Sequence, residues 1–143
     1  GTVARPNDLG GVFVRDNASN NQIGIAGQGN TIAGNKGNGI HVGGDKAKLV
    51  SIKQNYIGVA FSNSAYVALP NTQNGVLVDG GAQQVSIQNN HISHNALKGI
   101  ALAPASDDTG ALVVVSSDEQ PAYAATKANG MKNKDRVMCA PPT

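Results

Sequence analysis

Three stretches of this chain repeat one pattern of short apolar strands separated by Asn- and Gly-containing turns. Each unit opens on a glycine, a second strand follows 12 or 13 residues later, and a third strand begins with Asn. The units open at Gly11, Gly39 and Gly75, carry Ile23, Ile52 and Ile87 in the second strand, and have Asn30-Thr31-Ile32, Asn55-Tyr56-Ile57 and Asn90-His91-Ile92 as the third. A nearly fixed register of this kind is typical of units that stack on one another, and it predicts an all-β fold, a short single-stranded parallel β-helix of about four coils with three strands per coil.

The pattern also sets the expected boundaries. A fourth, partial unit starts at Gly99, and Leu112–Val115 falls where its second strand should lie. We therefore predict the β-helix domain over residues 11–115, with an insertion loop at about 59–73. Because exposed sheet edges need cover, residues 1–10 are expected to form an N-terminal cap and residues 116–143 a C-terminal tail or cap. Within that tail, Ala122–Met131 is compatible with a short cap helix or with disorder.

Side-chain alternation gives each strand an inward and an outward face. The inward residues, almost all β-branched, are expected to be Val12, Val14, Ile40, Val42, Val76, Val78, Ile100 and Leu102 on the first sheet, Ile23, Val50, Ile52, Val85 and Ile87 on the second, and Ile32, Ile57 and Ile92 on the third. A chain with two Phe, three Tyr and no Trp suits such a narrow interior. The column Asn30, Asn55 and Asn90 is predicted at a turn, where Asn tolerates the left-handed backbone region and can bond the Asn one coil away.

Composition excludes several classes of function. The net charge is +2 and no basic block is longer than Lys132-Asn133-Lys134, so a nucleic-acid interface is not expected. No apolar run is long enough to cross a bilayer, and the chain shows no signal-peptide pattern at its start. The single cysteine, Cys139, excludes an internal disulfide and a cysteine metal cluster.

Several phrases carry a family resemblance. The segments Asn55-Tyr56-Ile57-Gly58, Ala68-Leu69-Pro70-Asn71 and Asn74-Gly75-Val76-Leu77-Val78-Asp79-Gly80-Gly81-Ala82 are similar to repeats of large bacterial secreted or surface proteins. Over roughly residues 11–115 the chain resembles the right-handed parallel β-helix repeat family, the pectate-lyase-like superfold. The resemblance implies a right-handed coil and an extracellular or cell-surface location. It leaves activity open, since the family includes lyases, hydrolases, epimerases, tail spikes and adhesins.

Outward residues of the first sheet supply the catalytic candidates. Arg15 and Asp79 are expected two coils apart, with Gly43 leaving room between them, and His41 and Asp45 lie nearby. A carbohydrate-active enzyme, either a polysaccharide lyase or a glycoside hydrolase, would use such groups, and only the lyase would require Ca²⁺. The alternative interpretation is a set of isolated, solvated side chains beside turns. No metal site or other cofactor is predicted, because His41 lies on a different sheet from His91 and His94.

Ligand-binding candidates are expected on the outward face of the third sheet, at the neighbouring polar positions of the second sheet and in the insertion. Proteins bind sugars with aromatic rings that stack on them and with polar side chains that hydrogen-bond their hydroxyl groups. The predicted ligand-binding residues are Tyr56, Phe61, Tyr66, Lys53, Gln88 and His91. The alternative is that the insertion only shields the adjacent sheet.

Three functions are therefore considered. The favoured one is a non-catalytic β-helix module that binds polysaccharide or serves as a structural unit of a bacterial surface protein. The alternatives are a carbohydrate-active enzyme and a self-assembling protein that forms homo-oligomers through its exposed β-helix ends.

Overall fold

The computed structural model describes residues 3–103, 113–116 and 137–140, and within these ranges the chain consists of strands and turns without a helix. Three of its sheets are parallel throughout. The fourth is an antiparallel hairpin. The predicted all-β class is therefore confirmed, and the parallel sheets are compatible with a parallel β-helix.

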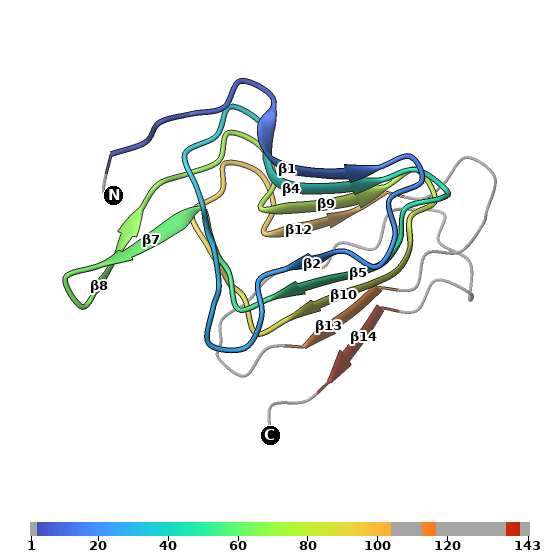
Figure 1. The fold of residues 1–143 in the computed structure, drawn as a ribbon. Helices are drawn as coiled ribbons and strands as arrows, with labels where there is room; N and C mark the ends of the chain where they lie inside the picture. Colours follow the sequence, from blue (N-terminus) through green and yellow to red (C-terminus); the bar gives the residue numbers. More distant parts are fainter. Residues whose placement is uncertain (1–2, 104–112, 117–136, 141–143) are drawn as a thin grey trace.

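Strands of one sheet come from successive sequence units. The first sheet has the order β1 (Gly10–Arg15), β4 (Asn38–Gly43), β9 (Val76–Asp79) and β12 (Ile100–Leu102). The second has the order β14 (Val137–Ala140), β13 (Val113–Ser116), β10 (Gln83–Gln88), β5 (Lys48–Lys53) and β2 (Gln22–Ile23). The third has the order β11 (His91–Ile92), β6 (Tyr56–Ile57) and β3 (Thr31–Ile32). Figure 1 shows that, within each of the first two sheets, neighbouring strands follow one another in the order of the sequence.

The strand register matches the alignment made from the sequence. Ile23 pairs with Ile52 and Ile52 with Ile87, and the other inward columns are continuous in the same way. The expected inward residues form one buried cluster, in which Ile40, Ile52 and Ile57 have no exposed surface. Val12 and Ile92 are only partly buried, because each stands at the end of its column.

Columns of asparagine lock adjacent units together at the turns. In the Asn55 ladder, made of Asn30, Asn55 and Asn90, the backbone N–H and side-chain amide of each Asn donate to the Oδ1 of the next at 2.9–3.0 Å. Asn55 also donates to the Ile23 carbonyl at 2.8 Å. The predicted contact between the Asn residues of adjacent units is thus confirmed.

One detail of the prediction is wrong. The left-handed backbone falls one residue before the ladder, at Gln54 and Asn89, with φ of 55° and 52°. The Asn itself keeps an ordinary backbone, so its side chain can extend along the stack.

Two further asparagine columns were not anticipated. The Asn71 ladder is made of Asn7, Asn35, Asn71 and Asn95. A shorter Asn74 pair joins Asn74 to Asn38. Buried side-chain amides of this kind are tolerated only when fully bonded, and among the described residues no buried side-chain N or O atom lacks a partner.

The segments at the two ends both join the stack, the first through contacts of Asn7 and Asp8 and the second by strand pairing. At the N-terminal side Asn7 continues the Asn71 ladder, and Asp8 forms a 2.7 Å ion pair with Lys36. At the other side β13 pairs with β10 in the expected register, and β14 adds residues 137–140, including Cys139, to the second sheet. The uncertain segment 122–131 lies outside the described residues.

The expected insertion is a hairpin. Strands β7 (Val59–Ser62) and β8 (Ala65–Ala68) pair antiparallel around Asn63 and Ser64, both of which have positive φ as a tight hairpin turn requires. The base is anchored, since Val59 and Ala60 are buried. The hairpin projects from the stack (Figure 1), and β7 contacts β3 and β6 of the third sheet.

The Asn71 ladder provides a stability test. Asn71 is fully buried, accepts from Asn35 and donates to Asn95 and to the Ile32 carbonyl. Asn71→Ala leaves several buried polar groups unbonded, so we expect the free energy of unfolding to fall by about 3 kcal/mol or more.

Urea denaturation followed by circular dichroism measures this change. Asn17→Ala is the control, because Asn17 is exposed and should shift stability by less than about 0.5 kcal/mol. An equal, small effect of both substitutions would show that the ladder does not stabilise the fold.

Candidate functional site

Four rings meet where the hairpin folds back on the third sheet. Tyr56 and His91 are register partners on β6 and β11, and Phe61 and Tyr66 are register partners on β7 and β8. The planes of Tyr66 and His91 are nearly parallel, with centroids 4.1 Å apart and 15° between them. Tyr56 packs against Phe61 and Tyr66 at 6.1 and 6.0 Å. We call these four residues the ring cluster.

Packing of the rings stabilises an otherwise marginal hairpin. An isolated two-stranded ribbon has little stability in water, and within the described residues β7 and β8 form ladder bonds only with each other. Aromatic contacts contribute roughly 0.5–1.5 kcal/mol each beyond their buried area. Phe61 and Tyr66 nevertheless remain about half exposed, at 52% and 50%, so ring surface is left for a ligand.

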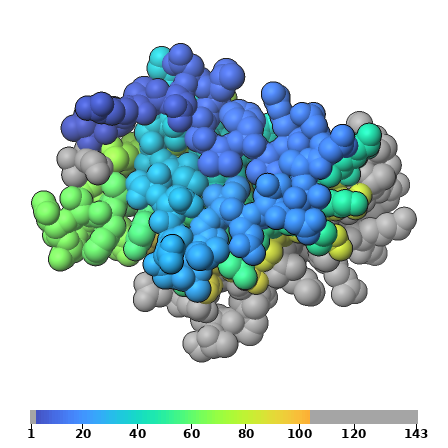
Figure 2. All heavy atoms as spheres, viewed as in Figure 1, coloured from blue at the N-terminus to red at the C-terminus, as the bar shows by residue number. Residues whose placement is uncertain are grey.

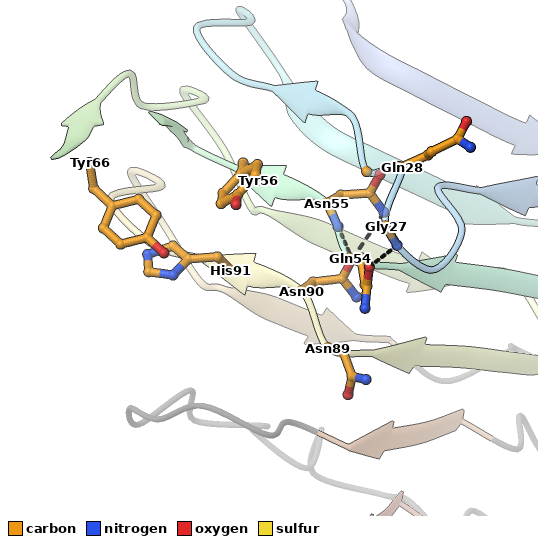
Figure 3. A pocket seen from close by; sticks show the side chains of 10 residues that line it. Gly27, Gln28, Gln54, Asn55, Tyr56, Tyr66, Asn89, Asn90 and His91 are labelled. Atoms are coloured by element: carbon orange, nitrogen blue, oxygen red, sulfur yellow. Dashed lines mark hydrogen bonds between the residues drawn. The ribbon is translucent and has the colours of Figure 1, made fainter. Parts of the chain in front are cut away.

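A cavity of about 520 Å³, here called the ring pocket, lies beside this cluster. Its lining residues are Gly27, Gln28, Gly29, Gln54, Asn55, Tyr56, Tyr66, Asn89, Asn90 and His91. Figure 3 shows Tyr66 facing His91 on one side and the amide side chains on the other. Apart from the imidazole, every side chain lining the pocket is uncharged at neutral pH, so the pocket favours an uncharged ligand.

The wall opposite the rings is a turn inserted into the first unit. Ile25 and Gln28 exchange backbone hydrogen bonds at 3.1 and 2.9 Å, and the side-chain oxygen of Gln54 accepts from the Gly27 N–H. Gly29 passes so close to the next unit that a Cβ there would lie 1.6 Å from the Gln54 carbonyl oxygen. Glycine at this position therefore permits the turn to reach the pocket.

The structure brings together only part of the expected ligand-binding set. Tyr56, Phe61, Tyr66 and His91 form the ring cluster. Lys53 and Gln88 are neighbours on β5 and β10 and are not among the residues that line the pocket.

Sequence reasoning missed Gln28, Gln54 and Asn89, which the structure places around the pocket. A usable signal was present, since Gln54 and Asn89 directly precede the Asn55 ladder. Gln28 lies in the turn inserted into the first unit, where no repeated position pointed to a role in binding.

A second polar cavity lies on the first sheet and is also about 520 Å³; we call it the His41 pocket. Its lining residues are Arg15, Asp16, Asn17, His41, Gly43, Gly44, Asp45, Lys46 and Asp79, so all four catalytic candidates border it. Arg15, Gly43 and Asp79 occupy one row across β1, β4 and β9, as the sequence suggests.

Within this pocket the shortest contact joins His41 to Asp79. The His41 Nε2 lies 2.8 Å from the Asp79 Oδ1, and both side chains are partly buried. Arg15 instead has a loose contact with Asp16, 3.8 Å between exposed groups. His41 stands in the outward row beside Leu77, and Asp79 stands in the next outward row beside Gly43. Their hydrogen bond therefore connects two outward rows of the first sheet.

Two kinds of feature are absent from the described residues. In residues 3–103, 113–116 and 137–140, no three His, Cys, Asp or Glu side chains gather closely enough to hold a metal ion. A search of the same part of the chain finds no helix with the length and hydropathy of a membrane span. Comparisons of the chain with protein-family models, curated proteins and solved structures give no significant match.

Gly43 makes the contact between His41 and Asp79 possible. A Cβ at this position would lie 2.5 Å from the Asp79 Oδ1 and 3.0 Å from the His41 Nε2. The φ of Gly43 is not positive, so alanine can adopt the backbone, and we expect Gly43→Ala to break the hydrogen bond without unfolding the sheet.

Imidazole ¹⁵N shifts of His41 report the change. In the Gly43→Ala variant they should move toward those of a solvated histidine, whereas the shifts of His94 should stay as they are. Unchanged His41 shifts would contradict the described geometry.

Proposed function

We propose that the chain is a right-handed parallel β-helix module, with three strands per coil, that binds neutral carbohydrate in the ring pocket. Three observations support the proposed architecture: three parallel sheets, the contribution of one strand per unit to each sheet, and continuous inward columns. The family resemblance supports the handedness and a place in a bacterial secreted or surface protein. Binding, rather than catalysis, is the function assigned to this pocket.

The observation that carries the proposal is the combination of ring faces and amides around one uncharged cavity. Sugar rings present apolar C–H faces that pack on aromatic planes, and their hydroxyl groups both donate and accept hydrogen bonds. Tyr56 and Tyr66 supply the planes, while Gln28 and Asn89 are exposed amides able to bond hydroxyls. The volume lies within the range of about 300–1,000 Å³ found for small-molecule sites.

Neutral glycans are favoured over acidic ones. A uronate-rich polymer would require cationic side chains to bind its carboxylates. Lys53, the lysine among the predicted ligand-binding residues, does not line the pocket.

Titration calorimetry with a panel of neutral oligosaccharides, and with oligogalacturonate for comparison, tests the proposal. We expect a neutral glycan to bind and Tyr66→Ala to weaken it roughly 3- to 10-fold, as the loss of one stacking contact predicts. Phe13→Ala is a matched control, since it removes an exposed ring from a different sheet.

Three results would count against the proposal: no binding of any neutral glycan, tighter binding of the acidic one, or equal losses in the two variants. The melting temperature of each variant shows whether the fold is retained.

Self-association is a second candidate function, favoured by the N-terminal end of the stack. Strands β1, β2 and β3 are edge strands of their sheets within the described residues. A cavity of about 480 Å³ at this end is lined in part by Val12, Ile23 and Ile32. Figure 2 shows residues near the N-terminus, in blue, covering much of the visible face.

Exposed apolar side chains accompany these edges. Val3 and Leu9 are 78% and 80% exposed, and an open edge beside apolar surface favours pairing with a second copy of the chain. We expect Leu9→Lys to shift a dimer toward monomer in light scattering, and Leu97→Lys, which alters an exposed leucine outside the N-terminal segment, to leave it unchanged. A wild-type chain that stays monomeric at high concentration would exclude this candidate.

A further inference from the structure

The hydrogen bond between His41 and Asp79 determines which nitrogen of the imidazole is basic. A carboxylate accepts hydrogen bonds and does not donate them, so the hydrogen between these residues is carried by the His41 Nε2. In the neutral imidazole the lone pair then resides on Nδ1. Asp79 therefore orients a base and is not itself the group presented to a ligand.

The second nitrogen is available for chemistry. Within the described residues the contacts recorded for His41 are the bond to Asp79 and a tilted ring contact with Phe13, at 5.4 Å between centroids. Neither involves a hydrogen-bond partner for Nδ1. The side chain is 25% exposed and borders the His41 pocket, so a water molecule can reach it.

Cationic groups border the same pocket. Arg15 and Lys46 line it, together with Asp16, Asp45 and Asp79. The Arg15 side chain is 71% exposed and its contact with Asp16 is long, so its guanidinium can turn toward a developing negative charge. Positive groups near a reacting acyl carbon stabilise the oxyanion that forms there.

We propose that the His41 pocket hydrolyses small carboxylic esters, such as the acetyl esters carried by sugar hydroxyls, with His41 as general base. This activity goes beyond the binding function assigned to the ring pocket and does not depend on it. Nδ1 of His41 takes a proton from water as the water oxygen bonds to the acyl carbon. The ester C–O bond then breaks, the alkoxide takes the proton back from His41, and the products are a carboxylic acid and an alcohol.

Ester hydrolysis fits this geometry better than cleavage of a glycosidic bond. Glycosidases act with two carboxyl groups that flank the bond, one as acid and the other as base or nucleophile. Here the best-placed carboxylate, Asp79, is engaged by His41. A neutral imidazole held in place by a carboxylate is suited to activating water toward an acyl carbon.

Hydrolysis of p-nitrophenyl acetate by the purified chain tests the proposal, after subtraction of the buffer rate. Loss of a general base typically lowers the rate by 10²–10⁴-fold, so we expect His41→Gln to reduce kcat/KM at least about 10²-fold. His94→Gln is the matched control, because it removes an exposed imidazole bonded only to Ser93 in the described part of the chain.

The pH profile separates general-base catalysis from a structural effect. After subtraction of the buffer rate, the wild-type turnover should depend on pH, and this dependence should be absent from His41→Gln. No wild-type turnover above buffer, or equal rates for His41→Gln and wild type, would overturn the proposal. If His41→Gln fails to fold, modification of the wild type with diethyl pyrocarbonate replaces it, and turnover must fall in proportion to acylation at His41.

Asp79 is assigned a positioning role, which needs a different readout. Asp79→Ala should lower kcat more than it changes KM, and the ¹⁵N shifts of His41 should show a second tautomer with hydrogen on Nδ1. If neither the tautomer of His41 nor kcat changes in Asp79→Ala, then Asp79 does not position His41, and its proposed role is wrong.

Discussion

Bonds between asparagine side chains of adjacent units fix how the units stack, and both candidate sites depend on that register. In the Asn55 and Asn71 ladders one carboxamide oxygen accepts from the backbone and the side chain of the preceding unit. A slip of one residue would break these bonds and turn the apolar columns outward. The same register sets Gly43 beside Asp79 and Tyr56 beside His91, and so produces the two arrangements on which the proposals rest.

The ring pocket lies where the repeated pattern is interrupted, and the His41 pocket lies at the ends of regular strands. The ring pocket is built between two insertions, the turn at residues 24–29 and the hairpin at residues 59–68, which enter the stack at turns and leave its strands intact. The His41 pocket lies at the strand ends of the first sheet, where a glycine leaves space that a side chain would fill. A regular scaffold thus carries its chemistry on loops and at strand ends, as rigid repeat folds commonly do.

Much of the fold could be predicted from the sequence, because alternation and spacing report directly on burial. Residues such as Ile40 and Ile52 are inward for the reason that the alignment suggests, and the Asn55 ladder follows from Asn recurring at a turn. The Asn71 ladder carried the same signal, since Asn7, Asn35, Asn71 and Asn95 each stand four residues before the glycine that opens a unit; it was missed because the alignment began at that glycine. Pairing of β14 was missed because Val137–Ala140 belongs to no repeat unit.

Predictions for the sites were less complete. The row of Arg15, Gly43 and Asp79 follows from register alone, whereas the bond between His41 and Asp79 depends on side-chain rotamers that no spacing reveals.

Amide hydrogen exchange tests the central claim, that the ladders hold the register. The N–H groups of Asn35 and Asn55, which donate to Oδ1 atoms of the next unit, should exchange only through global unfolding, as slowly as those of the inward strands. Exchange at these two sites as fast as in an unprotected chain would contradict the account.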